Sequence, residues 1–262
     1  MAIRSYKIKK ISPKKKRQVT RVLARELGDE VPRARDFVEL MSGCGELSRQ
    51  LRNLVWLGAE FDCGTHHHSQ DINKLEGLLW ATLLTLSIKA KGILTAAPKC
   101  STWGRTALFT MGREQHGLSV LGYAEERADV AEANVTAEHV AFLLTLCTCR
   151  NVFMWLEQPT NSSLERHPAM RFALAVISAT RVHTWQGGFG HEMPKPTWMY
   201  TTLPAAVHHH LVAPRPDMRA PEGEFHARSG RWWHGTARLQ SSEHYPPDFA
   251  RAVALALLDA QA

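Results

Sequence analysis

Residues 36–51 constrain the fold of this chain more than any other stretch. The apolar run 37–41 predicts a buried strand, and Ser42-Gly43-Cys44-Gly45 predicts a tight turn after it. A helix is predicted next, because leucines recur at helical spacing, at Leu47, Leu51 and Leu54. Glycines suit such a turn because the backbone must bend sharply there. The stretch therefore predicts the strand, glycine turn and helix of an α/β fold.

An acidic residue follows this turn at the spacing of a nucleotide-binding unit. The turn reads Gly-x-Gly-x-x-Ser and lacks the third glycine of the dinucleotide fingerprint, so the glycines alone identify no ligand. Asp62, however, lies nineteen positions beyond Gly43, and an acid about 20 residues past the glycines binds ribose hydroxyls in βαβ units. Asp71 and Ile72 come next, where a further loop approaches an adenine ring. The spacing favours a nucleoside site; the alternative is an ordinary α/β turn with surface acids.

The composition is that of one globular domain. The chain has 262 residues, of which 44% are hydrophobic and 22% charged, enough for a full core. No apolar stretch approaches the roughly 18 residues of a membrane span, and no apolar segment follows the basic start, so we expect neither a membrane partner nor a secretory signal. Five scattered cysteines, an odd number, indicate reduced thiols. These features predict an intracellular protein.

The positive charge is concentrated in residues 1–35. That segment carries a net charge of +9, whereas residues 36–262 carry −2. Its basic side chains are placed to contact phosphates of a nucleic acid, most clearly Lys9, Lys10, Lys14, Lys15, Lys16 and Arg17. The same run is also typical of a nuclear address, which would apply in a eukaryotic cell, and of a solvated tail that binds nothing. We therefore expect a basic arm with a short helix at 19–27.

Strand and helix patterns alternate through the remaining 227 residues. Strands are predicted at 37–41, 59–62, 91–97, 151–156 and 181–185. Helices are predicted at 73–87, 124–146, 168–180 and 247–258. This alternation indicates one α/β domain over 36–262, with a doubly wound, mostly parallel, Rossmann-like sheet and helices on both faces. Residues 105–122 are predicted to form a mobile loop of the kind that closes on a substrate.

Two chemically active residue types stand at the ends of predicted strands. Cys100 follows the strand at 91–97, and Glu157 follows the strand at 151–156. Loops at the carboxyl ends of parallel strands line the ligand crevice, so both residues are expected near the nucleoside. Cys100 is a candidate nucleophile or an unreactive small residue. Glu157 is a candidate to orient or protonate a heterocycle, or a cap of the following helix.

The histidine and cysteine clusters do not predict a metal. The runs His66–His68 and His208–His210 place adjacent side chains on opposite faces of an extended segment, with no acid or Cys at ligand spacing. Cys63 with His66 and His68 is the one grouping worth testing against coordinates. Cys147 and Cys149 point in different directions from a helix and are interpreted as core thiols. We therefore expect no metal site.

Four segments together resemble the cytosine-5 DNA methyltransferase family over residues 36–165. They are Phe37 to Gly45, Phe61-Asp62 with Asp71-Ile72, Ala96 to Trp103, and Trp155 to Pro159. The resemblance implies a Rossmann-type fold that binds S-adenosyl-L-methionine. Carried over position by position, the cofactor-binding residues are Phe37, Glu39, Ser42, Gly43, Cys44, Gly45, Asp62, Asp71, Ile72 and Pro98.

The resemblance also implies a mechanism for DNA (cytosine-5) methylation. Cys100 would add to the ring, and Glu157 would hold and protonate the ring nitrogen. The sequence departs from the family where Lys99 separates Pro98 from Cys100, and where Gln158-Pro159 replaces Asn-Val. Two alternatives stay open: a catalytically inactive, nucleic-acid-associated module with this fold, and a methyltransferase acting on RNA or a small molecule.

Overall fold

The fold was analysed in a computed structural model. It describes residues 12, 14, 33–64, 68–104, 111–113, 120–122, 125–216, 224–226, 231–233 and 244–261, with backbone alone for 224–226 and 231–233. Several predictions lie outside these residues: the helix at 19–27, most of the loop at 105–122, and every basic residue of the arm named above except Lys14.

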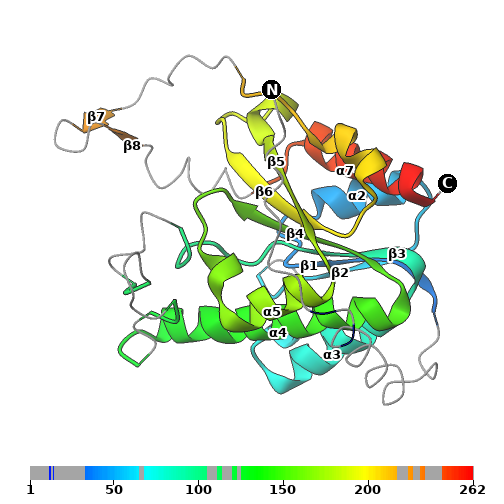
Figure 1. Cartoon of the computed structure of the whole chain (residues 1–262), viewed down its shortest axis with the longest axis horizontal. Coiled ribbons are helices and arrows are strands. Elements are labelled where there is room, and N and C mark those ends of the chain that lie inside the picture. The colour runs from blue at the N-terminus through cyan, green and yellow to red at the C-terminus, as the bar shows by residue number, and fades with distance from the viewer. Residues whose placement is uncertain are drawn as a thin grey trace.

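One mixed, mostly parallel sheet of six strands forms the centre of the molecule (Figure 1). Its strands in spatial order are β2 (Gly58–Phe61), β1 (Arg35–Leu40), β3 (Ile88–Ala96), β4 (Phe153–Pro159), β6 (Pro196–Thr201) and β5 (Thr180–Trp185). Only β6 runs against the others, paired antiparallel with β4 and β5. A separate two-stranded sheet joins β7 (Glu224–His226) to β8 (Arg231–Trp233). The prediction of an α/β fold with a mostly parallel sheet is confirmed.

Helices pack against both faces of the six-stranded sheet (Figure 1). One face carries α2 (Glu46–Asn53) and α7 (Pro247–Gln261). The other carries α3 (Leu75–Leu86), α4 (Ala128–Arg150) and α5 (Pro168–Val176). Short 3₁₀ helices complete the fold: η1 (His68–Gln70), η2 (Leu164–Arg166), η3 (Gln186–Phe189) and η4 (Ala205–Leu211). None of the helices in the described part of the chain has the length and apolar character needed to cross a membrane.

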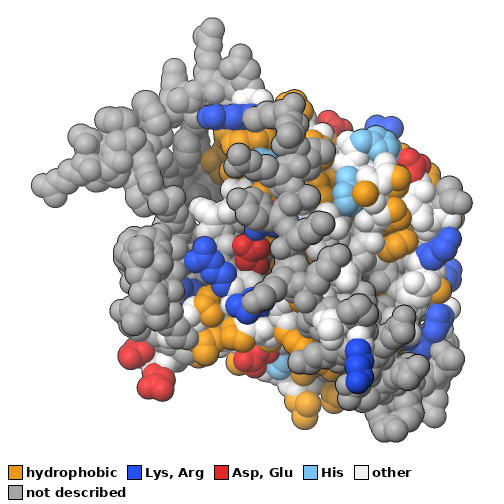
Figure 2. Space-filling view, viewed as in Figure 1, with side chains coloured by type: hydrophobic (Ala, Val, Ile, Leu, Met, Phe, Trp, Pro, Cys, Tyr) orange, Lys and Arg blue, Asp and Glu red, His pale blue; other side chains and the backbone are white. Residues whose placement is uncertain are grey.

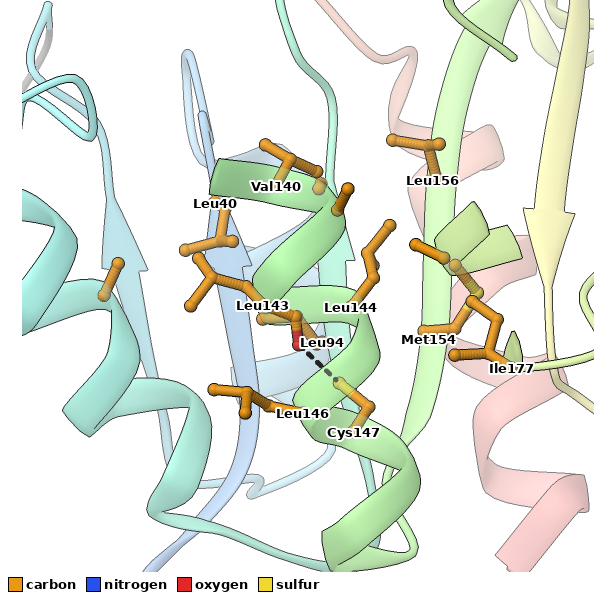
Figure 3. Packing of buried hydrophobic residues seen from close by; sticks show 14 of the residues in the cluster. Leu40, Leu94, Val140, Leu143, Leu144, Leu146, Cys147, Met154, Leu156 and Ile177 are labelled. Atoms are coloured by element: carbon orange, nitrogen blue, oxygen red, sulfur yellow. Dashed lines mark hydrogen bonds between the residues drawn. The ribbon is translucent and has the colours of Figure 1, made fainter. Parts of the chain in front are cut away.

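The two layers of helices enclose two hydrophobic cores, because successive side chains of a strand point to opposite faces. In β1, Val38 and Leu40 pack toward α3, α4 and α5, whereas Phe37 packs toward α2 and α7. Figure 3 shows the first core, in which α4 supplies most of the leucines that meet the strands. Cys147 is buried there and its thiol contacts the carbonyl oxygen of Leu143, as expected of a core thiol. Cys149 is half-exposed.

The predicted ends of helix α4 and strand β4 were wrong. Helix α4 continues to Arg150 and ends where Asn151 takes a left-handed conformation with φ 53°. Strand β4 continues through Pro159 because β6 pairs with its last residues, for example Gln158 with Trp198. Glu157 therefore lies inside a paired strand and does not cap a helix.

Candidate functional site

Four candidate residues follow or end neighbouring strands at one edge of the sheet. Leu40 of β1 pairs with Phe61 of β2 and with Ala96 of β3, and Ala96 pairs with Leu156 of β4. All four strands are parallel, so the residues just beyond these pairs leave the sheet at the same edge. The register brings the loops that carry Gly43, Asp62 and Cys100 to this edge, together with Glu157.

The direction of the connections changes at β1. The chain passes from β1 to β2 through α2 on one face, and returns across β1 to β3 through α3 on the other face (Figure 1). Open α/β sheets bind ligands outside the carboxyl ends of strands at such a switch point. The edge of the sheet beyond the carboxyl ends of β1 and β3 is therefore the position for a ligand that this topology favours.

The turn after β1 contains two glycines whose backbone angles favour glycine. Gly43 and Gly45 have φ values of 53° and 68°, a region that glycine enters without steric cost. A Cβ at Gly45 would lie 2.5 Å from the Glu60 carboxylate, whereas a Cβ at Gly43 would meet no atom within 4 Å. Cys44 is exposed, and the buried hydroxyl of Ser42 has no hydrogen-bond partner in the part of the chain that the structure describes. Gly43 thus faces open space.

Asp62 is held against this turn. Its Oδ2 accepts a hydrogen bond of 3.0 Å from the amide of Gly43, and its Oδ1 accepts one of 2.7 Å from the amide of Gly64. The side chain of Gln70 accepts from the amide of Asp62. The nineteen-residue spacing seen in the sequence therefore corresponds to a direct contact between the acid and the glycine turn.

Glu39 has a structural contact that the sequence interpretation did not foresee. Its Oε2 accepts hydrogen bonds from the amide and the hydroxyl of Ser48, in the first turn of α2. An acid at the start of a helix satisfies an amide that has no partner within the helix. Burial raises the pKa of Glu39 to about 7, although the bonds from Ser48 favour the charged form. This oxygen thus anchors α2 to β1.

Phe37 and Ile72, which the resemblance implies as cofactor-binding residues, are both buried in the hydrophobic cores. Phe37 is buried near the middle of β1 under α2 and α7, where Gly58 leaves room for its ring. Ile72 is buried in the opposite core, and its carbonyl oxygen contacts Nδ1 of His139. Asp71 lies in the turn before α3, where its Oδ1 accepts a hydrogen bond from the amide of Asn73. Phe37 thus lies under α2 and α7, away from the carboxyl end of β1.

The loop that carries Cys100 is tied to the end of β4. Gln158 donates from Nε2 to the carbonyl oxygen of Pro98 over 2.7 Å, and Ser163 donates from its amide to the carbonyl oxygen of Trp103. Within the loop, the carbonyl oxygen of Cys100 accepts from the amides of Trp103 and Gly104. Pro98 is buried, Lys99 is exposed and Cys100 is half-exposed. These hydrogen bonds hold the loop against the end of β4 and leave Cys100 partly accessible to solvent.

A buried arginine that the sequence interpretation missed supports the same loop. The guanidinium of Arg113 stacks 3.4 Å from the ring centre of Trp103 and donates to Oδ1 of Asn134 over 2.7 Å. It also donates to Thr102 and to the carbonyl oxygens of Val120 and Val130. Burial lowers the pKa of Arg113 to about 10, so the side chain stays charged at neutral pH. No local sequence pattern predicts these contacts, because they join residues of separate loops to α4.

Glu157 lies in a buried cluster of polar side chains, on the face of β4 opposite to Gln158. Nε2 of Gln186 donates to its Oε1 over 3.2 Å and to the hydroxyl of Thr197 over 3.1 Å. Burial raises the pKa of Glu157, and the positive charge of Lys195 acts in the opposite direction. Such an acid retains its proton to a higher pH than an exposed one.

Tyr245 lies close to this polar cluster. Its ring lies 5.9 Å from Nζ of Lys195 and 5.4 Å from the ring of Phe249 at the start of α7. The pKa of Tyr245 is raised by removal from water and by the nearby carboxylates of Glu157 and Glu39. The sequence signals for these residues were weak, because Gln186 only opens a glycine-rich stretch and Lys195 and Tyr245 only stand next to prolines.

The histidine run 208–210 was predicted to be extended, and this was wrong. It forms part of η4, and Nε2 of His210 lies 2.7 Å from Oδ2 of Asp259 in α7. The run therefore has an acidic partner 49 residues away, which ligand spacing along the chain does not reveal. In the proposed grouping with Cys63, His66 lies outside the described residues.

No protein-family model and no curated protein matches this chain.

Proposed function

We propose that the chain is an S-adenosyl-L-methionine-dependent methyltransferase with a doubly wound Rossmann-like fold, acting on C5 of cytosine in DNA. One observation supports the proposal most directly. The register of four parallel strands brings the turn at Gly43, the loops of Asp62 and Cys100, and the buried Glu157 to the same edge of the sheet. These are the groups that the resemblance implies for this reaction. They come from four separate parts of the chain, and the strands that carry them end beside a topological switch point.

The glycine turn and Asp62 support a site for the cofactor. The amide of Gly43 already orients Oδ2 of Asp62, and no atom would obstruct a Cβ at Gly43, so the backbone leaves room for a ligand to approach. Ribose hydroxyls are suitable donors to a carboxylate held at the end of the second strand. The unpartnered hydroxyl of Ser42 adds a polar group to the same turn. When bound, S-adenosyl-L-methionine supplies an electrophilic methyl group on a sulfonium.

Cys100 and Glu157 support the chemistry on the base. The thiolate of Cys100 forms a bond to C6 of cytosine while protonated Glu157 donates to N3, so the electron pair of the C5–C6 bond becomes available at C5. Carbon C5 would then take the methyl group that S-adenosyl-L-methionine supplies. The C5 proton would pass to water, the thiolate would leave C6, and N3 would return its proton to Glu157, which restores the aromatic ring. The raised pKa of Glu157 supports the role of proton donor. The target base must leave the stack to reach such a site.

The decisive experiment measures transfer of a labelled methyl group to duplex DNA that contains cytosine. We expect the wild-type chain to transfer label, and Cys100→Ser to abolish transfer while keeping its affinity for S-adenosyl-L-methionine. DNA with 5-fluorocytosine should become covalently attached to the wild-type chain, because fluorine at C5 blocks the elimination that releases the thiolate. Full methylation by the Cys100→Ser variant would remove Cys100 from the mechanism.

One feature favours a second function, a catalytically inactive module that binds nucleic acid. Lys99 inserts an exposed cation between buried Pro98 and half-exposed Cys100, and this shifts the cysteine by one residue relative to the family. Such a module would bind the cofactor or DNA without transferring label or trapping 5-fluorocytosine. Deleting Lys99 then distinguishes the two functions, since restored transfer would identify the insertion as the cause of the inactivity.

A further inference from the structure

A group of three side chains with metal-binding atoms lies outside the candidate site, on η4 and α7. Among the residues that the structure describes, His209, His210 and Asp259 place one potential ligand atom each within 4.8 Å of one another. The histidines belong to η4 and the aspartate to α7, two elements that pack together. Figure 2 shows histidine side chains gathered beside an acidic one over this part of the molecule, at the upper right. The group is open to solvent and thus accessible to an ion.

The histidines are oriented as metal ligands usually are. Nδ1 of His209 lies 2.8 Å from the carbonyl oxygen of Ala206, an acceptor that fixes the proton on Nδ1 and leaves Nε2 with a free lone pair. The rings of His209 and His210 lie with their centres 4.0 Å apart. Nε2 of His210 lies 2.7 Å from Oδ2 of Asp259. Ligand atoms around tetrahedral zinc lie about 3.3 Å apart, given bonds of about 2.0–2.1 Å, so small rotations of exposed side chains would complete the geometry.

The local charge favours a cation. Asp259 lies in the last turn of α7, and the described residues of that turn include no basic side chain. Unpaired carbonyl groups give the end of a helix a partial negative charge, so a carboxylate there is unfavourable unless a cation lies nearby. A divalent ion between Asp259 and the two imidazoles would neutralise both the carboxylate and the helix end.

We propose that His209, His210 and Asp259 bind a divalent transition metal, with zinc as the best fit. Two imidazole nitrogens and one carboxylate oxygen are ligands suited to zinc, with water in the remaining position. The ion would fasten η4 to the end of α7. Gln261, two residues after Asp259, contacts the carbonyl oxygen of Lys91 in the amino-terminal half of β3. The candidate site lies at the carboxyl end of that strand, so the ion would not take part in its chemistry. The proposal is therefore independent of methyl transfer.

The test is a calorimetric titration of the full chain with zinc chloride. Because His66–His68 could also bind zinc, all variants carry alanine at those three positions. In this background we expect one zinc ion per chain, with a dissociation constant in the micromolar range. His209→Ala and Asp259→Asn should each weaken binding by roughly tenfold or more. His208→Ala is the matched control, since its Nε2 is engaged with the carbonyl oxygen of Leu203, and its affinity should stay within about twofold of the background.

A second readout separates a site from loose surface binding. Saturating zinc should raise the melting temperature of the background variant, because a ligand that binds only the folded chain stabilises it. The rise should disappear in Asp259→Asn, whose fold is checked by circular dichroism. The proposal is overturned if the background variant binds no zinc, or if His209→Ala and Asp259→Asn bind it as tightly as His208→Ala does.

Discussion

Gln158 Nε2 lies 2.7 Å from the carbonyl oxygen of Pro98, so the end of β4 directly supports the loop that presents Cys100. The same side chain accepts a hydrogen bond from the hydroxyl of Ser162. Both contacts of the amide are made at a residue that is almost completely buried. The position of the cysteine loop thus depends on a residue that follows Glu157 in the same strand.

Replacing Gln158 by alanine should weaken the fold and the cysteine loop together. The change leaves a buried carbonyl group without its donor, which costs about 1–3 kcal/mol. Urea denaturation should show this loss in the free energy of unfolding. Gln261→Ala is the matched control, because Gln261 also donates to a carbonyl oxygen but at an exposed position. Equal losses in the two variants would show that burial of the Gln158 contact is unimportant.

Replacing Arg113 by methionine should destabilise the chain by about 2–4 kcal/mol, because several buried acceptors lose a charged donor. Lysine should not rescue the loss, since it lacks the planar fork that stacks on Trp103 and reaches these acceptors. Thermal and urea unfolding measure both variants. Arg127→Lys, at an exposed position, should behave as the wild type; a rescue by lysine at Arg113 would contradict the stacking argument.

The buried carboxyl of Glu39 should make stability depend on pH. Its pKa rises from 4.5 to about 7 on folding, so the folded chain binds the proton more tightly than the unfolded chain does. Stability therefore falls as the pH rises from 4.5 to 7, by about 3 kcal/mol. Glu39→Gln keeps an acceptor for Ser48 and should remove this part of the fall.

Urea unfolding of the wild type and of Glu39→Gln across pH 4 to 8 tests this prediction. Glu157 also has a raised pKa and contributes in the same direction in both proteins, so the difference between the two curves reports Glu39. That difference should grow with pH in favour of the variant. Two parallel curves would show that Glu39 does not titrate in this window.

Gln186 should position Glu157 for proton donation if the proposed function is correct. Gln186→Leu removes the hydrogen bond to Oε1 of Glu157 and should lower kcat for methyl transfer by roughly 10- to 100-fold, since small displacements of a reacting group are costly. The affinity for S-adenosyl-L-methionine should change little. Gln50→Leu, which loses a bond to Glu46 on α2, is the control. An unchanged kcat in Gln186→Leu would exclude this positioning role.

Deleting residues 1–18 should reveal whether the basic arm binds phosphates. If it does, affinity for DNA falls and its dependence on salt becomes weaker, because each lost phosphate contact lowers the slope of log K against log salt by about 0.9. Electrophoretic or fluorescence binding assays at several salt concentrations measure both effects. A methyltransferase for small molecules would keep its activity without the arm.

The sequence predicted the alternation of strands and helices up to β5 and the glycine turn, because these follow from local periodicity and from backbone angles that glycine adopts easily. It also placed Asp62 at the correct distance from Gly43, since a short βαβ unit leaves little freedom between the two. It did not predict β6. Which face of the sheet each strand residue occupies depends on how the helices pack against the strands. This packing buries Phe37 in a hydrophobic core.

The tertiary structure also decided the contacts between distant segments. It inserted β6 against β4, surrounded Glu157 with Gln186 and Thr197, and placed Asp259 beside His210. Such pairs lie far apart along the chain, and no local pattern encodes them. Burial and the resulting pKa shifts depend on everything that packs around a group, and this is why the chemistry of the site emerged only from the folded molecule.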